Sequence, residues 1–102
     1  MRIIEILLPL YRNDGSPQPQ ALFAAVREEM VKRFGGLTAF TRSPAEGLWQ
    51  QSDGERSGDE IVIFELMADW LDRTWWTEYR AQLERDFEQE AIVVRARAIE
   101  LL

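Results

Sequence analysis

Charged side chains interrupt three otherwise apolar segments of this sequence, and they are the first candidates for chemistry. They are Glu5, Glu65, Arg95 and Arg97. Because side chains alternate between the two faces of a strand, these positions predict that all four share one face of an antiparallel sheet. Opposite charges are expected to pair there, with Glu5 between Glu65 and the two arginines.

Two interpretations of this charged group remain open. The first, which we favour, is a set of ion pairs inside a subunit interface, where each charge is tolerated because it has a partner. The second is an anionic ligand held by Arg95 and Arg97, with Glu65 acting as a base.

Aromatic residues form a second group of candidates, because indole side chains are enriched at binding sites. The tryptophans are Trp49, Trp70, Trp75 and Trp76. Trp76 has the spacing of a helical core residue, and Trp70 and Trp75 lie near the start of the same expected helix, so core filling is favoured over a pocket for these three. Trp49 either covers a pocket or caps the core. Tyr79 shares the helical stripe of Trp76.

Arg42 lies beside Pro44, where a bulge is expected in a strand. Bulges often redirect side chains toward a site, although an exposed loop charge is the simpler interpretation. Together with the residues above, Arg42 completes the set of candidate ligand-binding residues. The set is Arg42, Trp49, Glu65, Tyr79, Arg95 and Arg97.

Missing residue types restrict the chemistry further. The chain has no cysteine and no histidine, which excludes thiolate and imidazole nucleophiles and the ligands that zinc, copper or heme commonly use. Lys32 is the sole lysine and falls in a charged helical stretch, which argues against Schiff-base chemistry. We therefore expect no metal and no cofactor. The net charge of -6 opposes nucleic-acid binding.

The size of the chain predicts one domain over residues 1–102, because 102 residues with 46% hydrophobic content suffice for a single core. Its apolar runs are much shorter than the roughly 18 residues of a membrane-spanning segment. Glu5 interrupts the first apolar run, and no small-residue cleavage site follows, which opposes a signal peptide. We expect a cytoplasmic protein with no membrane partner.

The chain must position these candidates with a small number of elements. Periodicity predicts strands at residues 2–10, 37–42 continuing to 48–51, 60–68 and 92–101, and helices at residues 20–34 and from Asp69 or Asp72 to about Gln89. The order βαββαβ predicts a ferredoxin-like α+β fold, in which a four-stranded antiparallel sheet of order 4-1-3-2 carries both helices on one face.

The sheet face without helices is expected to be too apolar for water. It should carry Ile3, Leu7, Ile61, Ile63, Met67 and Ile99. Because soluble monomers rarely expose such a patch, the sequence predicts a homodimer whose geometry is left open.

Three short segments carry a resemblance to a known family. Residues 33–38 (RFGGLT), residues 47–49 (GLW) and residues 60–63 (EIVI) resemble a small bacterial family of uncharacterised ferredoxin-like domains. The element order is also similar to that of the dimeric α+β barrel superfamily. That resemblance implies relatives among cofactor-free monooxygenases, heme-degrading enzymes and ligand-binding modules, and the missing histidine argues against the heme activity.

Two functions follow from these observations. The first is a homodimeric small-molecule-binding or structural domain, because no reactive constellation stands out. The alternative is a cofactor-free monooxygenase- or isomerase-like enzyme acting on a small organic substrate, for which Trp49, Glu65 and Tyr79 are the best candidates. The ligand itself is left open.

Overall fold

The fold consists of one sheet and two helices in the order βαββαβ. The computed structural model describes the backbone of residues 1–50 and 56–102 and the side chains of residues 1–40 and 60–102. The elements are β1 (Arg2–Pro9), α1 (Gln20–Phe34), β2 (Thr38–Gln50), β3 (Arg56–Ala68), α2 (Arg73–Asp86) and β4 (Val94–Ala98). None of the described helices is long and apolar enough to cross a membrane.

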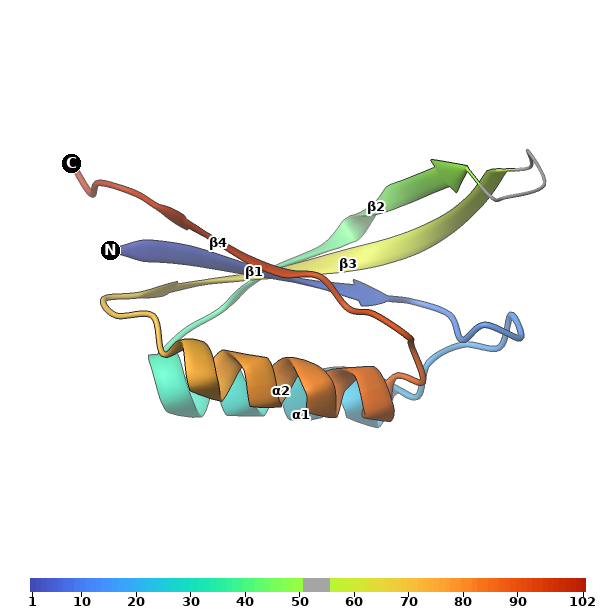
Figure 1. Ribbon diagram of the computed structural model, residues 1–102, viewed down its shortest axis with the longest axis horizontal. Helices are drawn as coiled ribbons and strands as arrows, with labels where there is room; N and C mark the ends of the chain where they lie inside the picture. The colour runs from blue at the N-terminus through green and yellow to red at the C-terminus, as the bar shows by residue number, and fades with distance from the viewer. Residues whose placement is uncertain (51–55) are drawn as a thin grey trace.

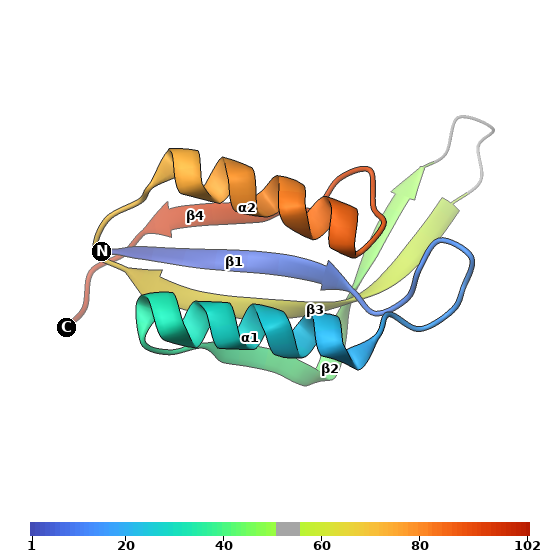
Figure 2. The same cartoon turned by 90° about the horizontal axis from the view of Figure 1, so that it is seen from below.

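The four strands pair antiparallel in the order β2-β3-β1-β4. Both helices lie against the same face of this sheet, and the opposite face carries no helix (Figure 1). Seen from the helix side, α2 runs alongside β4, and β1 lies between the two helices (Figure 2). The predicted ferredoxin-like fold and its strand order are therefore confirmed.

The hydrophobic core lies between the sheet and the helices. Alternation along β1 and β3 turns Ile4, Ile6, Leu8, Val62, Phe64 and Leu66 toward the helices, which contribute Phe23, Val26, Met30, Trp76, Tyr79, Leu83 and Phe87. Burying one such aliphatic or aromatic side chain stabilises the fold by about 1.5–3 kcal/mol. The helix-facing side chains thus supply the main driving force for the βαββαβ arrangement.

The ends of α1 follow from proline and glycine chemistry. The helix begins after Pro19 and ends at Gly35, which adopts a left-handed conformation with φ of 83°. The Gly35 backbone N–H donates to the Val31 carbonyl at 2.8 Å. Glycine takes this conformation without the steric cost of a Cβ, so the predicted stop of the helix at this position is confirmed.

The start of α2 is set by one of the two aspartates proposed from sequence. Asp72 is the N-cap, and its carboxylate accepts a hydrogen bond from the Trp75 backbone N–H at 3.1 Å. The helix ends at Asp86, earlier than the expected end near Gln89, and Glu88 has a positive φ of 53°. Asp72 rather than Asp69 therefore sets the rotational phase of α2.

The edge strands differ from their expected lengths. The register of β2 against β3 shifts between Phe40 and Ala45, in the region where Pro44 predicted a bulge. β2 continues through this irregularity without a break. The Asp53-Gly54 pair between these strands predicts a hairpin turn, and it lies outside the described residues. β4 is shorter than the predicted residues 92–101, because pairing with β1 extends only from Val94 to Ala98.

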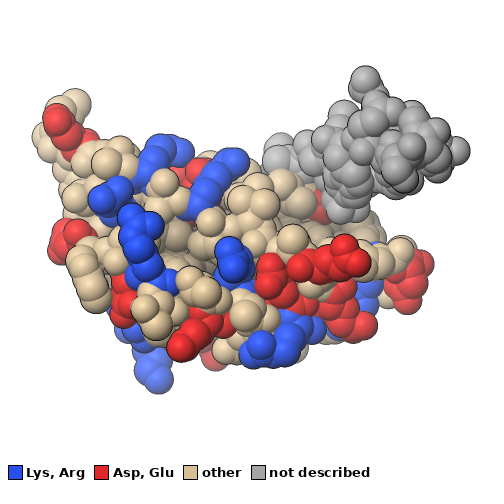
Figure 3. Space-filling view, in the orientation of Figure 1, with Lys and Arg blue, Asp and Glu red and all other residues tan. Residues whose placement is uncertain are grey.

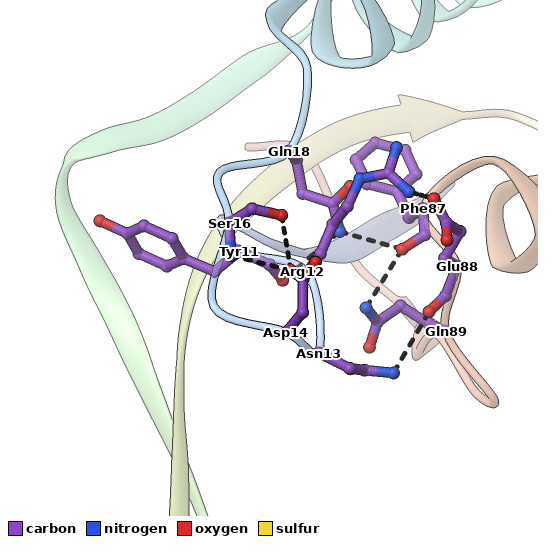
Figure 4. Close-up of polar contacts among 9 residues, drawn as sticks. All are labelled: Tyr11, Arg12, Asn13, Asp14, Ser16, Gln18, Phe87, Glu88 and Gln89. Atoms are coloured by element: carbon purple, nitrogen blue, oxygen red, sulfur yellow. Dashed lines mark hydrogen bonds and ion pairs between the residues drawn. The ribbon is translucent and has the colours of Figure 1, made fainter.

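Polar contacts tie the loop after β1 to the end of α2 (Figure 4). The Gln18 side chain is 2% exposed and donates from Nε2 to the Phe87 carbonyl at 2.9 Å. Asn13 donates to the Glu88 carbonyl at 3.4 Å, and Arg12 forms an ion pair with Glu88. The Gln18–Phe87 contact joins residues 69 positions apart, and the Asn13–Glu88 contact joins residues 75 positions apart.

Candidate functional site

The helix-free face of the sheet has a charged centre built on Glu5. The Glu5 Oε1 atom accepts hydrogen bonds from Arg95 Nε at 3.0 Å and from Arg97 Nη1 at 3.2 Å. Cross-strand pairing explains this geometry, because Glu5 faces Arg95 across the β1–β4 ladder and Arg97 lies two residues further along the same face. The predicted pairing of opposite charges on this face is confirmed, with Glu5 as the acceptor.

Exposure differs strongly between the two sides of this ion pair. The Glu5 side chain is 12% exposed, whereas the Arg95 and Arg97 side chains are 56% and 59% exposed. A guanidinium carries five N–H donors, and each arginine directs one of them to Glu5. Glu5, Arg95 and Arg97 together therefore carry one excess positive charge. The guanidinium N–H groups that do not bond to Glu5 can donate to a further acceptor.

Glu65 lies on the neighbouring strand of the same face. It is directly opposite Glu5 in the register of β1 and β3, and it is half-buried. Among the described residues, no cation lies within ion-pair distance of Glu65. The structure thus brings Glu65, Arg95 and Arg97 onto one face, while the hydrogen bonds of the arginines go to Glu5.

Apolar side chains surround the charged centre. Ile3, Leu7, Ile61 and Ile63 are half-buried, and Phe40 and Met67 are 48% and 50% exposed. None of the helices covers this face (Figure 1). The arrangement is an open apolar surface in which two arginine side chains are held in place by a carboxylate.

Tyr79 lies in the helix layer on the other side of the sheet. It is 8% exposed, and its ring stacks on Trp75 with centroids 4.8 Å apart. Burial raises the pKa of Tyr79 above the ordinary value of 10.0, and the Glu29 and Asp86 carboxylates raise it further. The structure does not bring Tyr79 together with Glu65, Arg95 and Arg97.

The tryptophans divide between core and surface. Trp76 is 6% exposed and stacks on Phe34 with centroids 5.5 Å apart, and Trp75 is half-buried, so the core interpretation is confirmed for both. For Trp70 it is wrong, because this side chain is 74% exposed. Trp70 lies in the bend before the Asp72 cap, and Leu71 packs against the core instead.

Two predicted site residues fall on the irregular strand β2. The side chains of Arg42 and Trp49 lie outside the described residues, and their roles in binding stay predictions. The β2 backbone at Trp49 pairs with Ser57 of β3.

Glu5 is the site residue missing from the predicted set. Its alternation with Ile4 and Ile6 predicted that Glu5 lies on the charged face. Its position on a central strand was the feature of the sequence from which its role as a site residue could have been predicted. Strand order alone makes β1 the neighbour of both β3 and β4, so Glu5 is the acid that reaches the arginines.

Comparison with known proteins adds information on the fold. No protein-family model and no curated protein matches this chain. A solved structure of a phage SAM lyase in complex with S-methyl-5'-thioadenosine is similar, with a TM-score of 0.58 and 19% identity over 94% of this chain and 79% of that one. The phage SAM lyase in its apo state gives a TM-score of 0.57 and 17% identity over 94% and 78%. At this identity the likeness establishes a shared small α+β fold.

Proposed function

We propose that this chain is a homodimeric domain that binds a small organic acid on its helix-free sheet face. One observation carries the proposal: the mostly buried Glu5 carboxylate holds both Arg95 and Arg97 on an apolar face that the helices leave uncovered. The absence of cysteine and the absence of a membrane-spanning helix among the described residues fit a cytoplasmic protein.

The apolar part of the face supports dimerisation. Monomeric proteins seldom leave a contiguous apolar patch of this kind in water, and a second copy of the same face removes it from solvent. The charges would allow Glu65 of one copy to approach Arg95 and Arg97 of the other. A ligand carboxylate bound to the arginines would take the place of this contact.

The remaining N–H donors of the arginines support ligand binding. Guanidinium groups recognise carboxylates with paired hydrogen bonds, and fixing them in advance lowers the entropic cost of binding. Leu7 and Ile63 provide an apolar surface beside them. A carboxylate on a small hydrocarbon body matches both features.

A cofactor-free enzyme is the second candidate function. It is favoured by the likeness to the phage SAM lyase, an enzyme of the same fold that was solved with a small organic molecule. Glu65 would then serve as the base and the arginines would stabilise developing negative charge. Glu65→Gln should abolish turnover in that case, whereas it should leave the affinity of a binding domain within a few-fold.

Sedimentation velocity at micromolar concentration tests the dimer. We expect a dimer for the wild-type chain and a monomer for Ile63→Glu, which places a charge at the centre of the helix-free face. Val31→Glu on α1, where the side chain is already 52% exposed, is the matched control and should remain dimeric. A monomeric wild-type chain would contradict the proposal.

Calorimetric titration with a panel of small organic acids tests the ligand, and S-methyl-5'-thioadenosine serves as a non-acidic comparison. Arg97→Gln should weaken binding of the acids by about tenfold, because one charge-assisted hydrogen bond is lost. Arg85→Gln, in the last turn of α2, should have no effect. Equal affinities for both variants would place the ligand elsewhere.

A further inference from the structure

A groove separates the edge strand β4 from the first half of α2, and arginines dominate its walls. The arginines are Arg2, Arg73 and Arg80, and no aspartate or glutamate among the described residues lines the groove. Arg95 also borders it, but its guanidinium bonds to Glu5 on the helix-free face. The volume of the groove is about 260 Å³. It opens on the helix side of β4, so it is distinct from the helix-free face.

Small side chains on β4 create this space. Val94, Ala96 and Ala98 occupy the positions of β4 that alternate with Arg95 and Arg97, and both alanines are exposed. Ile4 and Trp76 contribute apolar surface to the groove. The result is an apolar floor beneath positively charged walls.

The charge of the groove is mostly uncompensated. Of its three arginines, Arg80 lies 4.0 Å from Glu84, whereas Arg2 and Arg73 form no ion pair with any described residue. Figure 3 shows basic atoms gathered across β4 and the start of α2, and most acidic atoms nearer the end of α2. The groove is thus basic although the whole chain has a net charge of -6. The unpaired arginines therefore favour a ligand that carries two negative charges.

We propose that the groove binds the phosphate ester of a small, flat organic molecule. The phosphate lies among the arginines, whose planar guanidinium groups match its oxygens, and the organic part lies on Ala96 and Trp76. A phosphate carries roughly two negative charges at neutral pH and so offsets more of the arginine charge than a single carboxylate does. The volume, below the roughly 300–1,000 Å³ of drug-sized sites, restricts the ligand to a small metabolite.

NMR titration of the 15N-labelled chain with phenyl phosphate tests this proposal. We expect saturable shifts at the backbone amides of Thr77 and Ala96. The double variant Arg73→Gln/Arg80→Gln should weaken binding by about tenfold or more, and Arg85→Gln on the same helix should retain wild-type affinity. Absence of saturation at millimolar phenyl phosphate, or equal affinity of the double variant and the control, overturns the proposal.

A second variant tests the apolar floor of the groove independently of its arginine charges. Ala96→Leu fills the groove without changing its charge, so it should weaken phenyl phosphate binding and leave inorganic phosphate binding unchanged. Ala24→Leu on the exposed surface of α1 is the control for added hydrophobic volume. Arg97→Gln, which impairs the proposed organic-acid site, should not affect phenyl phosphate. If phenyl phosphate binding is lost in Arg97→Gln but not in Arg73→Gln/Arg80→Gln, the assignment of a separate site is overturned.

Discussion

Glu5 and Glu65 lie directly opposite each other in the register of β1 and β3. Two carboxylates at facing positions repel each other, and this repulsion is relieved here because Glu5 accepts hydrogen bonds from Arg95 and Arg97 on its other side. The two glutamates therefore have different environments. Glu5 holds both arginines, and Glu65 forms no ion pair with any described residue.

Glu5→Gln should destabilise the fold by about 1–2 kcal/mol, because the arginines lose a mostly buried charged acceptor. The figure is modest because both arginine side chains are more than half exposed. Glu65→Gln, the matched control at the facing position, should change the stability of the monomer by less than about 0.5 kcal/mol. Urea unfolding at low protein concentration measures both. Equal losses would contradict the assignment of Glu5 as the internal acceptor.

We predict an energetic link between Glu65 and the two arginines in the proposed dimer, because within one chain both arginines bond to Glu5. If the dimer forms through this face, Glu65→Gln combined with Arg95→Met or Arg97→Met should give non-additive losses of dimer stability. The coupling should vanish when the protein is diluted to monomers. Full additivity at every concentration would show that these side chains do not meet.

Gln18→Leu should cost about 1 kcal/mol of stability, because the Phe87 carbonyl loses the shorter of its two side-chain hydrogen bonds and keeps the one from Gln89 Nε2 at 3.1 Å. Gln18→Glu should cost more at neutral pH, because a carboxylate would face the carbonyl oxygens that now accept from Nε2. Gln82→Glu, at an exposed position of α2, is the control. Thermal unfolding compares the three variants. A Gln18→Glu variant as stable as the wild type would contradict the buried hydrogen bond that Gln18 donates.

Tyr79 should make the protein less stable in alkali. The pKa of Tyr79 is raised in the folded state, so above the ordinary value of 10.0 the unfolded chain loses its proton while the folded chain keeps it. Stability is therefore fully present below that pH and falls as the pH rises above it. Tyr79→Phe should reduce this slope. Guanidinium unfolding between neutral pH and about pH 11 measures the effect, and identical slopes would contradict it.

Trp76→Ala should destabilise the fold by about 3–5 kcal/mol, because it removes a buried ring that stacks on Phe34. Trp70→Ala should stay within about 0.5 kcal/mol, since this side chain is 74% exposed. Chemical unfolding of the two variants makes the comparison. A large loss for Trp70→Ala at low protein concentration would contradict the exposed position of this side chain.

Local patterns were sufficient for the elements, and the handedness of the crossover connections then predicted their order in the sheet. Alternation predicted the two faces of β1 and β3, and helical spacing with Gly35 predicted the bounds of α1. These features are encoded by neighbours a few residues apart, whose chain geometry is nearly independent of the rest of the fold. Trp70 was misplaced because two aspartates could cap α2, and the choice of Asp72 sets the direction of every side chain at its start.

The sequence by itself determined the βαββαβ fold, the charged sheet face and the exclusion of thiol and imidazole chemistry. Only the tertiary structure decided that one oxygen of Glu5 is shared by Arg95 and Arg97, that the side chain of Trp70 is exposed, and that Arg2, Arg73 and Arg80 line one groove. These outcomes depend on contacts such as Glu5 with Arg95, which are 90 residues apart. Periodicity assigns a face to each side chain, but strand neighbours and helix packing select its partner.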